Sequence, residues 1–136
     1  MRRVCCGSPR TATDDQSCAP HRNSARKRWK EFVNQHDGLK WHARFAAAHD
    51  KPMTFPEWGL VHRRDGIGGG DNSYFIAQMR RWIKRHKVAY QIYFNGRDPN
   101  AEYAISSGRF PKAEKRFLEL FGAKAHRGRS RPDTAR

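Results

Sequence analysis

The sequence has little apolar content and no long apolar run. Hydrophobic residues make up 37% of its 136 residues, which is low for a globular domain, so part of the chain is expected to remain unpacked. No stretch of about 18 apolar residues occurs, and the sequence therefore predicts no membrane span. Arg2 and Arg3 resemble the start of a signal peptide, but no apolar stretch follows them, so we expect no cleaved secretion signal.

Cysteine is also scarce, and all of it lies near the N-terminus, as Cys5, Cys6 and Cys18. No CxxC pair and no Cys/His set at zinc-finger spacing is present, which argues against a structural zinc or a disulfide framework. The histidines show no HExxH spacing. The glycine-rich run at 66–71 lacks the third glycine of a dinucleotide-binding fingerprint. The sequence therefore predicts no metal and no cofactor.

Positive charge, by contrast, is abundant, with 28 Lys and Arg against 13 Asp and Glu and a net charge of +15. Such an excess first suggests a polyanionic partner, nucleic acid above all. However, residues 1–30 and 123–136 together carry two-thirds of the net charge, and neither end has hydrophobic periodicity. We therefore expect disordered basic segments at 1–28 and 123–136 flanking a folded part at 29–122, and nucleic-acid contact only through these tails.

The folded part begins with a predicted helix at 38–49 followed by a predicted strand at 52–59. In the helix, Trp41, Phe45 and Ala48 recur along one face. In the strand, the period of two places Met53, Phe55 and Glu57 on one face and the residues between them on the other. Pro56 lacks an N–H and suits the end of a strand, so Glu57 is expected at the C-terminal end of this strand.

A second helix, strand and helix follow. The helix from about residue 72 to 87 has a predicted core stripe of Phe75, Ile76, Met79, Trp82 and Ile83. Asp71 or Asn72 can cap it. Residues 88–94 form a predicted strand, because they are aromatic and β-branched. The last predicted helix opens at Pro111, buries Ala113, Phe117, Leu120 and Phe121, and ends at Gly122.

The two predicted strands lie about 30 residues apart with a helix between them, which is typical of a βαβ unit with parallel strands. Two parallel strands do not make a complete domain, because a parallel sheet needs cover on both faces and further strands. The sequence thus predicts an α/β fold that is one part of a larger architecture.

Glu57 is the sharpest candidate for a catalytic residue. Active sites of (β/α) barrels collect at the carboxyl ends of the strands, and a carboxylate there can attack an anomeric carbon while a neighbouring aromatic stacks on the sugar. On position alone, a capping or ion-paired glutamate is the more common role. The other candidates near the strand ends are Trp58, Tyr93 and Phe94 as stacking aromatics and His62, Asp71 and Asn72 as hydrogen-bonding groups. Their alternative roles are core packing and loop or cap chemistry.

Several segments together resemble actinobacterial proteins of glycoside hydrolase family 26, typified by β-mannanases. They are Gly38-Leu-Lys-Trp-His, Phe45-Ala-Ala-Ala-His, Lys51-Pro-Met-Thr-Phe-Pro-Glu-Trp-Gly, Gly68-Gly-Gly-Asp-Asn, Tyr74-Phe, Trp82-Ile and Val88-Ala-Tyr. The resemblance covers about residues 29–122 and implies the last two βα units of a (β/α)8 TIM barrel plus a preceding helix. It implies that Glu57 is the nucleophile of a retaining mechanism, with Trp58, Tyr93 and His62 as substrate-binding residues and a polysaccharide or oligosaccharide as substrate.

The chain departs from that family in one large respect. Retaining hydrolysis needs a second carboxyl group roughly 5–5.5 Å from the nucleophile, and the barrel strand that carries it in the family has no counterpart here. A complete barrel of this type needs about 250 residues. We therefore expect a truncated partial barrel that does not hydrolyse sugars alone. The family is typically secreted, whereas this chain shows no signal peptide, so the sequence assigns neither a compartment nor an oligomeric state.

The alternative function is that of a small basic nucleic-acid-binding protein. Its reading element would be the helix at 72–87, with Arg80, Arg81, Lys84 and Arg85. This hypothesis predicts a helical module whose basic face enters a groove. The two hypotheses differ over the strand at 88–94, which has no role in a helix-turn-helix but is essential to a βαβ unit. A third possibility is that the chain has no stable function, because exposed sheet edges promote aggregation.

Overall fold

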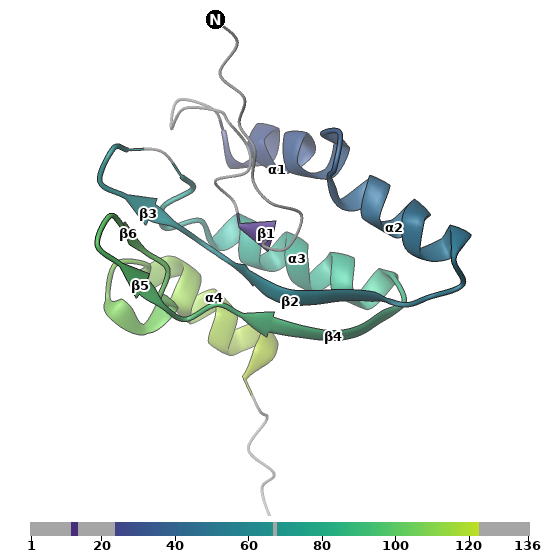
Figure 1. The fold of residues 1–136 in the computed structure, drawn as a ribbon. Helices are drawn as coiled ribbons and strands as arrows, with labels where there is room; N and C mark the ends of the chain where they lie inside the picture. The colour runs from purple at the N-terminus through teal and green to yellow at the C-terminus, as the bar shows by residue number, and fades with distance from the viewer. Residues whose placement is uncertain (1–11, 14–23, 67, 123–136) are drawn as a thin grey trace, which may run out of the picture.

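The computed structural model describes residues 12–13, 24–66 and 68–122. This part of the chain has a mixed α/β fold with two small sheets and no closed barrel (Figure 1). Its helices and strands follow in the order β1 (Ala12–Thr13), α1 (Ala25–Asn34), α2 (Leu39–Ala48), β2 (Met53–Gly59), β3 (His62–Arg63), α3 (Ser73–Arg85), β4 (Val88–Tyr93), β5 (Arg97–Asp98), β6 (Ala101–Glu102), the 3₁₀ helix η2 (Ile105–Ser107) and α4 (Pro111–Phe121). The predicted α/β class is therefore confirmed.

The larger sheet is parallel, in the order β1-β2-β4, with β2 in the centre. Strands β2 and β4 pair from Met53 opposite Val88 to Trp58 opposite Tyr93. Helix α3 connects them, so the predicted βαβ unit with parallel strands is confirmed. Its strands begin and end within one residue of the predicted bounds.

The smaller sheet is antiparallel and was not expected from the sequence. Its order is β3-β6-β5, and each strand has only two residues. Figure 1 shows this sheet at the end toward which β2 and β4 run. The small sheet therefore builds up the carboxyl edge of the parallel sheet.

Helices α3 and α4 pack together behind the parallel sheet, as Figure 1 shows. The predicted core stripe of α3 is confirmed, because Phe75, Ile76 and Met79 are buried and Trp82 and Ile83 pack against the core. The predicted buried face of α4 is confirmed in the same way. No helix in the described ranges is both long and apolar enough to cross a membrane.

Two parts of the N-terminal segment expected to be disordered form secondary structure in the described chain. Strand β1 pairs with the end of β2, and α1 begins at Ala25. The Ser24 hydroxyl accepts a hydrogen bond from the Lys27 backbone N–H at 3.2 Å and caps α1. Trp29, Phe32 and Val33 form its apolar face within a run of charges. Residues 1–11, 14–23 and 123–136, on which the rest of the predicted disorder falls, lie outside the described residues.

Helix α2 forms where it was predicted, but the opposite face is buried. Leu39 and Ala46 lie in the core, whereas Trp41 and Phe45 are 37% and 52% exposed. Their rings stack on each other, with centroids 5.2 Å apart. The predicted stripe is therefore an exposed aromatic pair, because α2 meets β2 through its smaller side chains and the described chain supplies no element to cover the larger ones.

Candidate functional site at the carboxyl edge of the parallel sheet

A β-bulge in β2 determines where Glu57 lies. Phe55 pairs with Gln91 and Trp58 pairs with Tyr93, so β2 has one more residue than β4 between these two pairs. Such an extra residue re-aims the side chains next to it. Pro56 lies within the bulge, where its missing N–H costs the ladder little.

The bulge reverses the expected direction of the Glu57 side chain. The predicted alternation grouped Glu57 with Met53 and Phe55, but these two are 3% exposed and Glu57 is exposed. Trp58 takes the next buried position instead. The predicted alternation is therefore wrong beyond Phe55. Within the described residues the Glu57 carboxylate has no hydrogen bond or ion pair, and it is exposed to solvent near the C-terminal end of β2.

Trp58 is a core residue. Its side chain is fully buried, and its indole N–H donates a hydrogen bond to the Gln91 side-chain oxygen. Ring centroids 5.2–6.3 Å away surround it, those of Phe75, Tyr93, Phe117 and Phe121. Neither face of the indole is open to a ligand, and its role in this structure is to fix the end of β2 directly after Glu57.

Tyr93 is the partner of Trp58 on β4 and holds the loops at this edge. Its hydroxyl accepts a hydrogen bond from the Leu60 backbone N–H at 3.2 Å and donates one to the Tyr103 carbonyl at 3.4 Å. Its ring packs edge-on against Trp58. Tyr93 thus links the segment after β2 to the segment after β6, whereas its neighbour Phe94 remains partly exposed at 36%.

His62 is the predicted substrate-binding residue that the structure leaves exposed. It lies in β3, opposite Glu102 of β6 in the small antiparallel sheet. This sheet stands at the same edge as Glu57, three residues of chain after Gly59. His62 and Glu57 are therefore the two exposed, chemically active side chains that the sequence analysis named at this edge.

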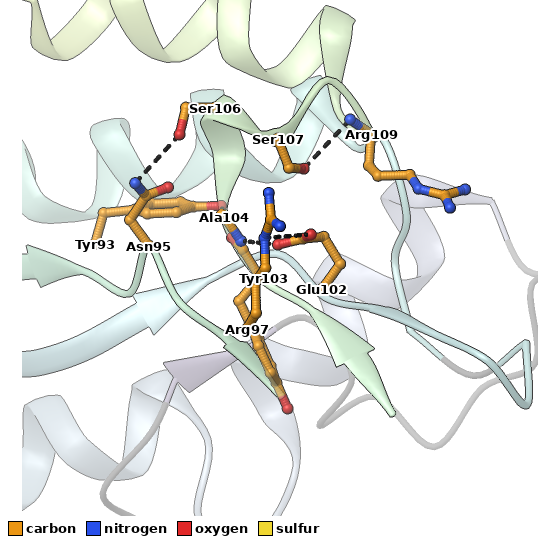
Figure 2. A network of polar contacts seen from close by, with 9 residues as sticks. All are labelled: Tyr93, Asn95, Arg97, Glu102, Tyr103, Ala104, Ser106, Ser107 and Arg109. Atoms are coloured by element: carbon orange, nitrogen blue, oxygen red, sulfur yellow. Dashed lines mark hydrogen bonds and ion pairs between the residues drawn. The ribbon is translucent and has the colours of Figure 1, made fainter. Parts of the chain in front are cut away.

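Glu102 is a second carboxylate at this edge, which the sequence analysis did not single out. Figure 2 shows it beside Arg97, whose Nε lies 3.0 Å from the Glu102 carboxylate. The same carboxylate accepts a hydrogen bond from the Ala104 backbone N–H at 2.9 Å, and its side chain is only 17% exposed. The ion pair and the backbone N–H donor engage the Glu102 carboxylate in holding this loop.

Short-range polar contacts complete the network in Figure 2. The Asn95 amide donates to the Ser106 hydroxyl at 3.3 Å, and the Arg109 backbone N–H donates to the Ser107 hydroxyl at the same distance. The first of these contacts joins the segment after β4 to η2, and the second is local to the end of η2. The network therefore fixes the loops at this edge of the sheet, and the Glu57 carboxylate takes no part in it.

Asp71 and Asn72 are helix caps, as their common role predicts. The Asn72 side chain accepts a hydrogen bond from the Phe75 backbone N–H at 3.0 Å and caps α3. The Asp71 carboxylate caps α4, accepting from the backbone N–H groups of Lys112 at 3.1 Å and Ala113 at 2.8 Å. Both side chains are therefore occupied by structural hydrogen bonds.

No cluster of three His, Cys, Asp or Glu side chains that could hold a metal ion occurs among the described residues. Among the described residues, the histidine with a perturbed pKa is His42 on α2, which packs edge-on against Phe55. Desolvation by burial lowers the pKa of His42 below its usual 6.5. This imidazole belongs to the contact between α2 and β2.

No family model, no curated protein and no solved structure matches this chain.

Proposed function

We propose that this chain is the C-terminal part of a (β/α)-barrel glycoside hydrolase of the retaining, β-mannanase-like class, with Glu57 as its nucleophile. On its own the chain binds no complete substrate and turns none over. The observation that carries the proposal is the exposed, unpartnered carboxylate of Glu57 at the carboxyl end of a central parallel strand, where barrel enzymes carry their catalytic groups.

The uncovered apolar surface supports a place in a larger barrel. Parallel sheets normally have both faces covered, but Tyr90 and Ile92 of β4 are 51% and 55% exposed. They alternate with Gln91 and Tyr93, which face the helices. In a barrel the exposed face would line the interior, and the free edge of β4 would pair with a further strand.

The exposed aromatic pair on α2 supports the same proposal. A barrel surrounds its strands with a ring of helices, each in contact with the next. Trp41 and Phe45 lie on the side of α2 that no described element covers. A preceding helix of a complete barrel would bury them.

The chemistry explains why the chain alone is inactive. In the first step the Glu57 carboxylate bonds to the anomeric carbon while the glycosidic bond breaks and a second carboxylic acid protonates the leaving oxygen. In the second step that group, now a carboxylate, takes a proton from water, whose oxygen displaces Glu57. Among the described residues, Glu102 is a second carboxylate at this edge, but Arg97 and the Ala104 backbone N–H already engage it. The acid must therefore come from another part of the barrel.

The neighbouring residues have different roles in this proposal. His62, which is exposed, contacts the sugar hydroxyls. Trp58 and Tyr93 act from the core, where they hold the bulge and thereby the direction of the Glu57 side chain. Trp58 is thus a positioning residue in this chain and not a stacking surface.

The test uses the chain as it is and the chain extended by the coding sequence upstream of it. The 136-residue protein should release no reducing sugar from β-mannan. The extended protein should hydrolyse β-mannan with retention of configuration, and Glu57→Gln should reduce its kcat by at least about 1000-fold, since loss of a nucleophile removes a covalent route.

Glu114→Gln is the matched control, because Glu114 is a half-exposed carboxylate on α4 with no contact to the edge. It should leave kcat unchanged. Hydrolysis by the 136-residue chain alone, or full activity of the extended protein with Glu57→Gln, would disprove the proposal.

A further inference from the structure

The opposite edge of the parallel sheet carries a concentration of positive charge. Five cations gather there, Lys51 before β2, Arg81, Lys84 and Arg85 on the last turns of α3, and Lys87 before β4. The Met53 backbone N–H donates to the Lys87 carbonyl at 2.8 Å, so the two strands begin side by side. Figure 1 shows the end of α3 at this same edge. We call these five residues the amino-edge patch.

The patch is poorly neutralised. All five side chains are exposed, and α3 contains no acidic residue. The one ion pair in the patch joins Lys87 to Asp50 at 3.9 Å, with both side chains largely in solvent. The other four cations have no ion pair in the described part of the chain. Like charges at this spacing repel one another on a helix, so the cluster has a cost in the free protein.

Helix-end chemistry accounts for only part of this charge. Cations in the last turn of a helix interact favourably with its unpaired carbonyl groups, which explains Lys84 and Arg85. Arg81 lies a turn earlier, and Lys51 and Lys87 lie outside the helix. Three of the five cations therefore have no such explanation.

Arg80, one of the four basic residues that the sequence analysis assigned to a reading helix, does not belong to the patch. Its guanidinium lies over the Phe121 ring, 5.2 Å from the centroid, and is half-buried between α3 and α4. A cation–π contact of this kind serves packing. The free charge on α3 is thus confined to Arg81, Lys84 and Arg85.

We propose that the amino-edge patch binds the phosphate backbone of a nucleic-acid duplex, without reading its sequence. Exposed lysines and arginines without carboxylate partners are the groups that displace counterions from a duplex. The sequence analysis offered the tails or the basic face of the helix at 72–87 for nucleic-acid contact. The fold removes Arg80 from that face and adds Lys51 and Lys87 to it, so the patch joins residues up to 36 positions apart.

The surroundings of the patch favour a duplex over a membrane or a single strand. Membrane-surface binding needs large apolar side chains beside the cations, and none is exposed in the segments 49–52 and 81–87. Single-strand binding needs free aromatic faces. The His86 ring is stacked on Trp82 at a centroid distance of 3.8 Å, and the exposed Phe45 ring at the end of α2 already contacts both Trp41 and His49. A cluster of cations with no exposed large apolar side chain in its own segments fits a contact with the phosphate backbone.

The patch and Glu57 are separate sites. Strand β2 has seven residues, so its two ends lie about 20 Å apart at roughly 3.3 Å per residue. The duplex-binding proposal therefore does not depend on the proposed glycosidase function, and Glu57→Gln should bind a duplex as the wild type does.

The test measures binding of a short random-sequence DNA duplex by the full chain across a range of salt concentrations, by fluorescence anisotropy. The comparison is between Arg81→Gln/Arg85→Gln and the matched pair Lys112→Gln/Lys115→Gln on α4, whose side chains are also exposed and whose loss changes the net charge equally. Far-UV circular dichroism confirms that each variant is folded.

The patch variant should reduce the salt slope of log K by about 2 and weaken binding roughly 50-fold at about 0.1 M salt, since each lost phosphate contact removes about 0.9 from the slope. The α4 variant should change binding less than threefold. Equal losses in the two variants would overturn the proposal, because they would report total charge alone. So would wild-type binding by the patch variant, which would assign the affinity to the tails, or a loss of affinity for anionic vesicles with duplex binding unchanged.

Discussion

Replacing Trp58 by alanine tests the most specific packing feature of the candidate site. Trp58 lies on the central strand of the parallel sheet. Its side chain is fully buried and packs against four other aromatic rings. We expect Trp58→Ala to remove much of the free energy of unfolding. If Trp58 instead formed part of a sugar-binding surface, the same substitution would affect stability only slightly.

The magnitude follows from the buried area. A buried tryptophan removes about 150–250 Å² from water, which at about 25 cal/mol per Å² corresponds to roughly 4–6 kcal/mol. Truncation of Trp to Ala in protein cores costs about 3–5 kcal/mol. Loss of the indole N–H also leaves the Gln91 side-chain oxygen without its donor, which adds about 1 kcal/mol. The total, about 4–6 kcal/mol, approaches the whole stability of a small domain.

Urea denaturation followed by far-UV circular dichroism measures this loss. With a slope of about 1.5–2 kcal/mol per molar urea, the midpoint should fall by about 2–4 M. Trp41→Ala is the matched control, because Trp41 is 37% exposed on α2 and its loss should cost only about 1 kcal/mol. Equal midpoints for the two variants would refute the placement of Trp58 in the core.

Three further predictions concern the scaffold around the site. Asp71→Ala should lower the free energy of unfolding by about 1–2 kcal/mol, measured in urea, because the N-terminus of α4 loses its cap; Asp71→Asn should recover most of it, and no loss would contradict the capping role. Burial lowers the pKa of His42, so the folded state favours the neutral imidazole. The contribution of His42 to stability is therefore complete above pH 6.5 and decreases as the pH falls below 6.5. In a series of Tm measurements at different pH values, His42→Leu should remove this dependence of Tm on pH, and an unchanged dependence would assign it to another group. Gly68→Ala should lower the free energy of unfolding by about 2–4 kcal/mol, since Gly68 has φ +115° and a Cβ would lie 2.7 Å from the Val61 carbonyl oxygen. Gly108→Ala, at a position with φ +81° and open space around it, should lower it by about 1 kcal/mol. Thermal unfolding distinguishes the two variants, and equal losses would contradict the steric argument.

The main helices and strands follow from local patterns that the sequence contains. The apolar stripe of α3 and the β-branched and aromatic run of β4 each indicate one type of element, and both formed at the predicted positions. The parallel pairing of β2 and β4 follows from the length of the connection between them. These features depend on neighbours within one or two turns of the chain, so sequence periodicity is sufficient to predict them.

Helix α1 was missed although its signals were present. Ser24 is a favourable N-cap, and Trp29, Phe32 and Val33 recur at helical spacing. The dense positive charge around them favoured an interpretation as solvated coil. In the structure α1 packs against α2 and α3, and these tertiary contacts stabilise a helix that composition alone did not predict.

The candidate site was likewise predicted only in part from the sequence. Its carboxylate and its place at the carboxyl end of a strand were predicted, but the direction of the Glu57 side chain depends on a bulge that exists only through the pairing of β2 with β4. Likewise, Asp71 caps a helix that begins 40 residues later, and Glu102 finds its partners in a sheet of two-residue strands. No local pattern encodes such contacts.

The low apolar content and the charge at the two ends were fixed by the sequence alone, as were the α/β class and the parallel βαβ unit, because local propensity and hydrophobic period are properties of the chain itself. Only the tertiary structure decided which faces are buried. It buries Trp58 and exposes Glu57, and it buries Leu39 and exposes Trp41. It also brings five cations together at one edge of the sheet. The physical reason is that burial and charge clustering depend on which distant segments meet, and that is determined by packing and strand register.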